Sequence, residues 1–165
     1  MPKVVAYVLL FLDGVAESPD QFFEWGDAVD ATMTEVIATQ DAVMLGRRSY
    51  DEWAAFWPGS EIEPFSTFIN GVKKYVATSN AARGLGQRDR DHRRPGGDIG
   101  VHASISVTQA LLDAKVADEL GLVIAPRIVG TGKRLLEGLP PIQLQPIRSD
   151  RSPSGHLLAV YRVTR

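Results

Sequence analysis

The sequence contains no cysteine among its 165 residues, which excludes disulfide bonds and thiolate metal sites. Its histidines, His92, His102 and His156, are far apart and lack the spacing of metal ligands, so we predict no metal site. No apolar run is long enough to span a bilayer, and no N-terminal stretch has the pattern of a signal peptide. The net charge of −2 provides no basic excess for binding nucleic acid or an anionic membrane. These absences predict a cytoplasmic protein that binds neither nucleic acid nor a membrane.

A chain of this length and composition is expected to form a single domain over residues 1–165. Apolar runs alternate with helix-forming segments along it. Strands are expected at residues 4–12, 42–45, 73–78, 99–102, 122–125, 142–147 and 157–163, and helices at residues 19–39, 47–56, 65–71 and 107–115. This order predicts a three-layer α/β/α fold with a mostly parallel sheet and a C-terminal antiparallel hairpin.

The clearest local pattern is the stretch from Asp41 to Tyr50. A short apolar strand breaks at Gly46, and Arg47, Arg48 and Ser49 then open a helix. A helix start offers unpaired N–H groups and partial positive charge, so with two arginines it suits a phosphate group. An ordinary strand–helix connection with two solvated arginines is an equally good interpretation of this stretch alone.

A second junction of this kind lies at residues 103–106, between the strand at 99–102 and the next helix. Ser106 and Gln109 have the spacing of a capping box, which places the helix start near Val107. This helix start is also suited to phosphate. Two such junctions in one small domain favour a nucleotide ligand.

Three carboxylates are candidates for chemistry. Asp13 follows the predicted central strand, where α/β sheets bind ligands, although it could simply stabilise its own turn. Asp27 and Asp30 lie near aromatic residues, which can raise a carboxyl pKa and suit it to proton transfer. The alternative for both is a solvated helix charge.

Two other segments offer groups for a substrate. Trp57 belongs to an aromatic cluster that either packs in a core or interface or stacks on a ring. Residues 128–136 contain glycines that allow close backbone approach to a ligand, with Lys133 and Arg134 available for a phosphate. By contrast, the arginine-rich residues 82–97 have almost no apolar side chains, and we interpret them as a mobile surface loop.

Several motifs together resemble the dihydrofolate reductase superfamily, and within it the C-terminal reductase domain of the bifunctional riboflavin biosynthesis protein. The motifs are FLDG at 11–14, DAVMLGRRSYDEW at 41–53, FWP at 56–58, NGVKKYVATS at 70–79, GGDIGVHASISVTQALLDAKVADEL at 96–120 and IAPRIVGTGKRLLEG at 124–138. The resemblance implies a dihydrofolate reductase-like fold, a homodimer and an NADPH-dependent reductase. The implied reaction transfers a hydride to a pyrimidine- or pterin-like substrate, as in 5-amino-6-(5-phosphoribosylamino)uracil reduction in riboflavin biosynthesis.

The resemblance also implies roles for individual residues. The cofactor-binding residues would be Gly46, Arg47, Arg48, Ser49, Thr78, Ser79, Val101, Ala103, Ser104, Ile105 and Ser106. Asp30 and Asp13 would be catalytic, and Asp27, Trp57, Lys133 and Arg134 would bind the substrate.

Two departures from the family pattern affect the cofactor site. Ala103 stands where relatives usually have glycine, and its methyl group would crowd the cofactor or forbid a special backbone geometry. The segment at 82–95 is too short and polar for the strand and helix that relatives have there, so we expect a sheet one strand short or an edge covered by a partner subunit. These departures keep open a second function, that of a non-catalytic nucleotide-binding or scaffold protein.

Overall fold

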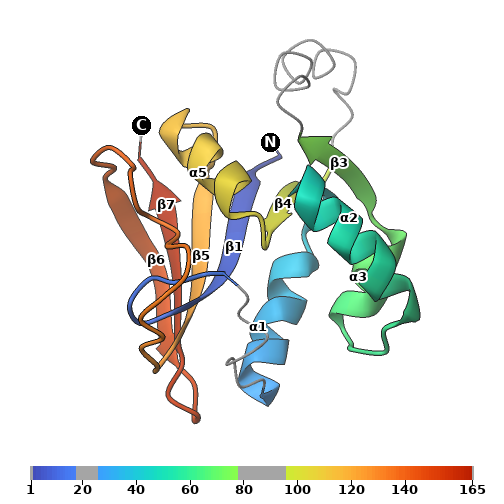
Figure 1. The fold of residues 1–165 in the computed structure, drawn as a ribbon, viewed down its shortest axis with the longest axis horizontal. Coiled ribbons are helices and arrows are strands. Elements are labelled where there is room, and N and C mark those ends of the chain that lie inside the picture. Colours follow the sequence, from blue (N-terminus) through green and yellow to red (C-terminus); the bar gives the residue numbers. More distant parts are fainter. Residues whose placement is uncertain (1, 18–25, 78–95, 165) are drawn as a thin grey trace.

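The computed structural model of the protein describes residues 2–17, 26–77 and 96–164. The strands are β1 (Val4–Phe11), β2 (Gln40–Gly46), β3 (Lys73–Ala77), β4 (Asp98–His102), β5 (Glu119–Ala125), β6 (Leu144–Arg151) and β7 (Leu157–Val163). The helices are α1 (Asp27–Ile37), α2 (Arg47–Phe56), α3 (Phe65–Gly71) and α5 (Ile105–Asp113), with a 3₁₀ turn, η2 (Trp57–Gly59), after α2. Figure 1 shows their arrangement. Within the described ranges, no helix is both long and apolar enough to cross a membrane.

Among the described residues, the strands form one seven-stranded sheet in the order β3-β2-β4-β1-β5-β7-β6. The first five strands in this order are parallel to one another, whereas β7 runs antiparallel to both β5 and β6. The predicted mostly parallel sheet with a C-terminal antiparallel hairpin is therefore confirmed. The central position of β1 explains why its sequence is apolar throughout, because neighbours flank it on both edges and helices or loops cover both of its faces.

Each face of the sheet has its own hydrophobic core. Alternate residues of β1 divide between them: Ala6 and Val8 pack on the side of α5, and Tyr7 and Phe11 pack on the side of α1 and α3. Helix α5 crosses β1 and β5 in Figure 1. Because α2 follows β2 and α5 follows β4 in the same sheet, the sheet fixes where both helices begin.

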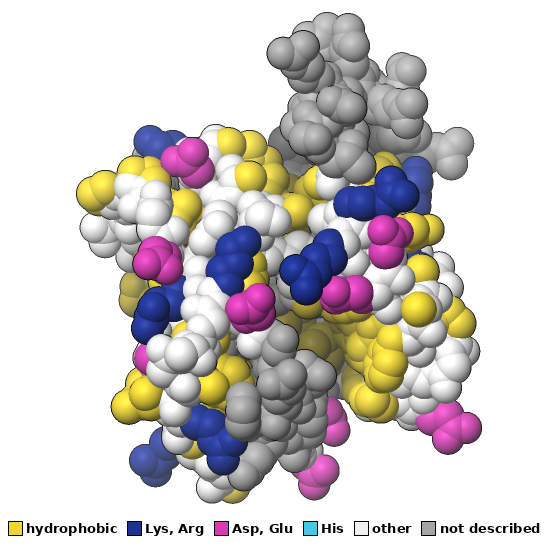
Figure 2. Space-filling model, viewed as in Figure 1, with side chains coloured by type: hydrophobic (Ala, Val, Ile, Leu, Met, Phe, Trp, Pro, Cys, Tyr) yellow, Lys and Arg dark blue, Asp and Glu magenta, His cyan; other side chains and the backbone are white. Residues whose placement is uncertain are grey.

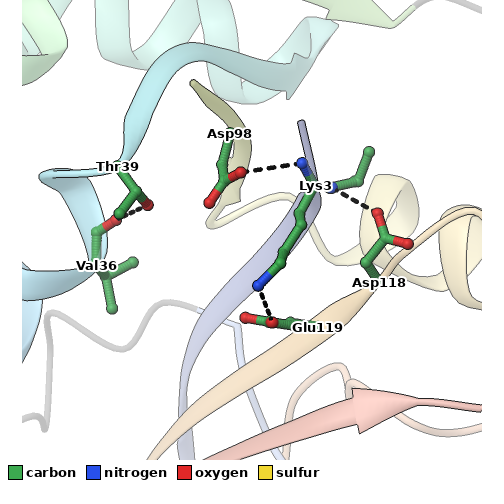
Figure 3. Close-up of polar contacts among 7 residues, drawn as sticks. Lys3, Val36, Thr39, Asp98, Asp118 and Glu119 are labelled. Atoms are coloured by element: carbon green, nitrogen blue, oxygen red, sulfur yellow. Dashed lines mark hydrogen bonds and ion pairs between the residues drawn. The ribbon is translucent and has the colours of Figure 1, made fainter. Parts of the chain in front are cut away.

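Polar contacts join the three central strands at their N-terminal ends (Figure 3). The backbone N–H of Lys3 donates to Asp98 at 3.0 Å, and its ammonium group donates to Glu119 at 2.7 Å. The backbone N–H of Val4 donates to Asp118 at 2.9 Å. Carboxylates therefore join β4, β1 and β5 at the N-terminal ends of these strands. Helices α2 and α5 begin at the other end of the sheet, after the C-terminal ends of β2 and β4.

Two predicted helices differ from the structure. The continuous helix expected over residues 19–39 is interrupted at Gly26, whose backbone is extended (φ −160°, ψ 167°), and its described part begins at Asp27. Residues 18–25 lie outside the described ranges. The helix expected from Val107 begins at Ile105, so Ser106 lies in its first turn and cannot act as a cap. The predicted hairpin strand also continues further than expected, to Arg151.

His102 closes β4 on the side of the aromatic core. It is 3% exposed, its Nε2 lies 2.8 Å from Gln40 Oε1, and the ring of Phe65 meets it nearly edge-on at 5.3 Å. Burial lowers the pKa of His102 to about 4. His102 is therefore neutral in the folded protein at neutral pH.

We expect acid to destabilise the fold through His102. The unfolded chain binds a proton near pH 6.5 and the folded chain near pH 4, so stability is full above pH 6.5 and falls as pH decreases toward 4. The gap between the two pKa values corresponds to at most about 3 kcal/mol of unfolding free energy. Denaturant titrations of the wild type and His102→Gln at pH 7 and pH 4.5 measure this. The variant should lose less stability between the two pH values, and an equal loss would contradict the assignment.

Candidate functional site

The candidate site lies where the parallel strands end. Because β1, β2 and β4 are parallel neighbours of one sheet, their C-terminal ends meet at one edge, where α/β folds bind ligands. Helices α2 and α5 lie on either side of β4 in Figure 1. Figure 2 shows a hollow on this face, with hydrophobic side chains on its visible floor and charged side chains of both signs near it.

A single hydrogen bond joins the two predicted phosphate junctions. The backbone N–H of Gly46 donates to the hydroxyl oxygen of Ser104 at 3.0 Å. Gly46 is the N-cap of α2 and Ser104 is the N-cap of α5, so the bond ties the two helix starts together across 58 residues of sequence. Both helix starts therefore present their N–H groups at the same edge of the sheet.

The start of α2 is unusual in its charges. Its N-cap is a glycine that makes no side-chain cap, its first turn has no acidic residue, and Arg47 and Arg48 are its first two residues. Cations at this end oppose the helix dipole. The arginines form ion pairs one turn further on, Arg47 with Asp51 at 3.2 Å and Arg48 with Glu52 at 3.0 Å.

Asp51 and Glu52 are not among the residues predicted from the sequence. Their spacing of four from Arg47 and Arg48 was the available signal, since residues four apart on a helix are neighbours. They become relevant only once the helix start itself is identified as a site.

The start of α5 is also left open. The hydroxyl of Ser104, which is 3% exposed, accepts from Gly46 and makes no cap for its own helix, and the first turn again has no acidic residue. Helix α1 differs, because Asp27 and Asp30 both lie in its first turn. Of these three helices, only α1 provides its own negative charge at its N-terminus.

Ala103 has a left-handed backbone with φ +56°, and it is exposed beside the start of α5. The expectation that its methyl group would forbid the special geometry is wrong, because the chain adopts that geometry with alanine. Such a conformation costs an L-residue roughly 1–2 kcal/mol. The strain lies at the residue that joins β4 to the open helix start.

The other predicted cofactor residues differ in how they lie. Val101 is fully buried in the core, so its side chain cannot line the cleft. Ile105 is half-buried and Ser106 is exposed in the first turn of α5, and Ser49 is half-buried in α2. Thr78 and Ser79 lie outside the described residues, as does most of the arginine-rich segment.

Asp13 holds a neighbouring loop. One of its carboxylate oxygens accepts the backbone N–H of Gly130 at 2.8 Å and of Val129 at 3.2 Å. The Gly130 hydrogen bond is the main cause that lowers the pKa of Asp13. A carboxylate stabilised in its ionised form is a poor proton donor at neutral pH, so its geometry favours a role in positioning this loop.

The loop that carries Lys133 and Arg134 is fastened to the residues after β1. Gln109 of α5 donates to the carbonyl of Leu135 at 2.9 Å, and Arg134 Nε donates to the carbonyl of Asp13 at 3.2 Å. Gly132 has φ +124°, and a Cβ there would lie 2.7 Å from Val15. At Gly132 the close approach is therefore to the protein's own Val15, whereas a Cβ at Gly130 would meet nothing within 4 Å. The loop places Arg134 beside the end of β1 and the second turn of α5.

Trp57 is the first residue of η2, directly after α2. It meets Trp53 and Phe65 in edge-on contacts, with ring centroids 5.9 and 4.9 Å apart. Beside it is a hollow of about 210 Å³, whose lining includes Leu45 and Ile69. The predicted substrate residues thus come from three different segments: Asp27 from α1, Trp57 from η2, and Lys133 with Arg134 from the loop after β5.

Comparison with known proteins agrees with this architecture. The chain is 16% identical to a putative riboflavin biosynthesis protein from Shewanella sp. PV-4, with a TM-score of 0.70 over 99% of both chains. It is 17% identical to a pyrimidine reductase-like protein from Corynebacterium diphtheriae, with a TM-score of 0.68 over 99% of this chain and 92% of that one. A Schistosoma mansoni dihydrofolate reductase has a TM-score of 0.59 over 99% of both chains at 12% identity. The protein therefore has a dihydrofolate reductase-like fold.

Sequence comparison finds similarity to one family model and to one curated protein. The sequence model of the RibD C-terminal domain matches residues 91–158. The uncharacterized protein YyaP of Bacillus subtilis is 24% identical over 177 residues, covering 96% of this chain and 94% of YyaP. The resemblance predicted from the sequence is confirmed over residues 91–158, where the chain is similar to the RibD C-terminal domain.

We predict that Ala103→Gly stabilises the protein and strengthens its binding of NADPH, the cofactor implied by the resemblance. Glycine relieves the left-handed strain, which should raise the melting temperature by about 2 °C in a chain of this size. Lys115 is the matched control, because it also has φ +56° but lies at the far end of α5. Lys115→Gly should raise the melting temperature without changing NADPH affinity. Equal effects of the two variants on NADPH affinity would contradict a special role for Ala103.

Proposed function

We propose that this protein is an NADPH-dependent reductase that transfers a hydride to a pyrimidine- or pterin-like substrate. The observation that carries the proposal is the pair of helix starts joined by Gly46 and Ser104, with two arginines and no first-turn carboxylate on either helix. Such an arrangement provides N–H groups and positive charge for phosphate groups. The similarity to a pyrimidine reductase-like protein supports the choice of reaction.

The residues present fit a dinucleotide phosphate. Arg47 and Arg48 are 70% and 88% exposed, so their guanidinium groups are accessible to a ligand. The open N–H groups of α2 and α5 would bind the phosphates together with these arginines. The small, exposed Ala103 allows a ligand to approach the backbone between β4 and α5.

The substrate end of the proposed site lies toward α1 and the loop of Arg134. NADPH, when bound, supplies a hydride to a carbon of a C=N or ring-opened ribosylamine-type group. The matching proton goes to the substrate from water or from Asp30, which is half-buried in the first turn of α1. Arg134, fastened through Nε to the carbonyl of Asp13, is the preferred partner for a substrate phosphate.

The special backbone at Ala103 supports the reductase over a scaffold with a degraded site. A left-handed alanine is strained, and strained residues are concentrated at functional sites. As part of the same proposal, we expect a homodimer.

Cofactor titration tests the proposal directly. The wild type should bind NADPH in a fluorescence titration, and replacing both Arg47 and Arg48 by glutamine should weaken binding by roughly tenfold or more, because two charged phosphate contacts are lost. Arg162→Gln on β7 is the control, since it removes the same kind of charge away from the candidate site. Absence of any thermal shift at millimolar NADPH would favour the scaffold function.

A second experiment identifies the substrate. NADPH oxidation is followed at fixed enzyme with dihydrofolate and, separately, with 5-amino-6-(5-phosphoribosylamino)uracil in its unreduced form. Arg134→Met should raise KM for the phosphorylated substrate and leave KM for dihydrofolate unchanged, because only the former carries a phosphate.

We further predict that Asp30→Asn lowers kcat by about 10²-fold, as expected when a proton donor is removed. NADPH affinity should change little, since Asp30 lies on α1, away from the phosphate junctions. Stopped-flow single-turnover measurements separate the chemical step from binding. An unchanged kcat would exclude Asp30 as the proton donor and leave water as the source.

A further inference from the structure

We propose that Asp13 and Glu17 are positioning residues that set the affinity of this protein for a phosphorylated substrate. Each accepts backbone N–H groups from the loop of residues 128–136, and together they hold Lys133 and Arg134 beside the end of β1. This role rests on the proposed function, since it concerns the cations that would bind the substrate phosphate in that same site. The two carboxylates act through the loop and do not contact the phosphate.

Backbone hydrogen bonds join this loop to the residues that follow β1. The N–H of Ala16 donates to the carbonyl of Lys133 at 2.9 Å, and the N–H of Leu135 donates to the carbonyl of Gly14 at 3.0 Å. Arg134 lies between these two bonds, so its backbone is held on both sides. The joined segments are more than 110 residues apart in the sequence, so the contact depends entirely on the tertiary fold.

The carboxylates add to this connection at both of its ends. One oxygen of Asp13 accepts the N–H groups of Val129 and Gly130, at 3.2 and 2.8 Å, and Glu17 Oε2 accepts the N–H of Lys133 at 3.0 Å. Hydrogen bonds to a charged acceptor are stronger than those between neutral groups. Loss of either carboxylate should therefore loosen one end of the loop that carries the cations.

The positive charges of the loop stay available, although two carboxylates lie close by. Lys133 and Arg134 are exposed, and neither forms an ion pair within the ranges that the structure describes. Arg134 uses only its Nε, which donates to the carbonyl of Asp13 at 3.2 Å. Because the carboxylates bind backbone N–H groups, two cations are held in place without direct neutralisation, as binding of a phosphate group requires.

Exposed apolar side chains in the same two segments support a ligand with an apolar part. Leu12, Ile128 and Leu136 are 61%, 72% and 48% exposed. The N–H of Leu12 donates to the carbonyl of Arg127 at 2.9 Å, which brings Leu12 beside the start of the loop. Apolar surface and cations together suit a ligand that combines a ring with a phosphate group.

The test measures binding of ribose 5-phosphate, with ribose as the uncharged probe, by ligand-observed NMR. Asp13→Ala and Glu17→Ala should each bind ribose 5-phosphate roughly five- to tenfold more weakly and leave ribose binding unchanged, because the loop is no longer held. Asp13→Asn and Glu17→Gln keep an acceptor oxygen and remove a negative charge, so they should bind at least as tightly as the wild type. Tighter binding by all four variants would show a purely electrostatic effect and overturn the proposal.

Asp41→Ala is the matched control. Asp41 is also an exposed carboxylate that accepts a backbone N–H from a distant segment, that of Gly97 at 2.6 Å, but it lies near the start of β2. Its replacement should lower the melting temperature about as much as Glu17→Ala does and leave ribose 5-phosphate affinity unchanged. An equal loss of affinity in this control would assign the effect to general destabilisation and refute the positioning role.

NADPH titration of the same variants separates this role from the proposed function. If NADPH binds the wild type but the alanine variants bind ribose 5-phosphate as the wild type does, the positioning role is wrong and the proposed function stands. If ribose 5-phosphate shows the expected losses and NADPH does not bind at all, the positioning role stands and the proposed function is wrong. If neither probe binds the wild type, both are wrong.

Discussion

The hydrogen bond from Gly46 to Ser104 is the interaction on which the candidate site depends. Strands β2 and β4 are neighbours, with Val43 opposite Gly100 and Met44 opposite Val101, so their C-terminal ends are adjacent by register. The bond then joins the two helices that follow these strands. It occupies the hydroxyl that would otherwise cap α5, and the N-cap of α2 is a glycine, which has no side chain to cap its helix. The hydrogen bond that orders the site is thus also the one that keeps the Ser104 hydroxyl from capping the N–H groups of α5, which are then available to an anion.

The two ends of the central parallel strands differ in how their polar groups are paired. At the N-terminal edge, Asp98, Asp118 and Glu119 satisfy backbone N–H groups and the ammonium of Lys3, and together they fix the three central strands. At the C-terminal edge, donors are left open and cations stand at a helix start. Proteins that break local stability rules usually do so at functional sites and compensate elsewhere in the fold. Here the compensation is an ordered edge at the opposite end of the same strands.

The sequence predicts most of what is local and little of what joins distant segments. The run from Ala42 to Ser49 contains an apolar strand, a glycine and a helix start, and the structure has all three in place. The capping box at Ser106 fails because Ser104 is the actual N-cap, and its partner lies 58 residues away. Asp13 and its loop partners are separated by more than 110 residues, so no local sequence pattern predicts that contact. Gly132 is likewise explained by Val15, a neighbour only in the folded chain.

Several destabilising features of this fold lie together at the junctions after β2 and β4, and their position indicates a ligand site. Ala103 is left-handed, two arginines oppose a helix dipole, and α2 and α5 begin without caps, all within the junctions after β2 and β4. Each of these lowers the stability of the empty protein. A bound phosphate group relieves the last two, and binding to the folded state alone then raises stability by mass action. Helix α1 also lacks a side-chain cap, but Asp27 and Asp30 in its first turn provide negative charge there. At the start of α2, two arginines take the place of such carboxylates, and this start is joined to that of α5, which is the physical reason to expect an anionic ligand between them.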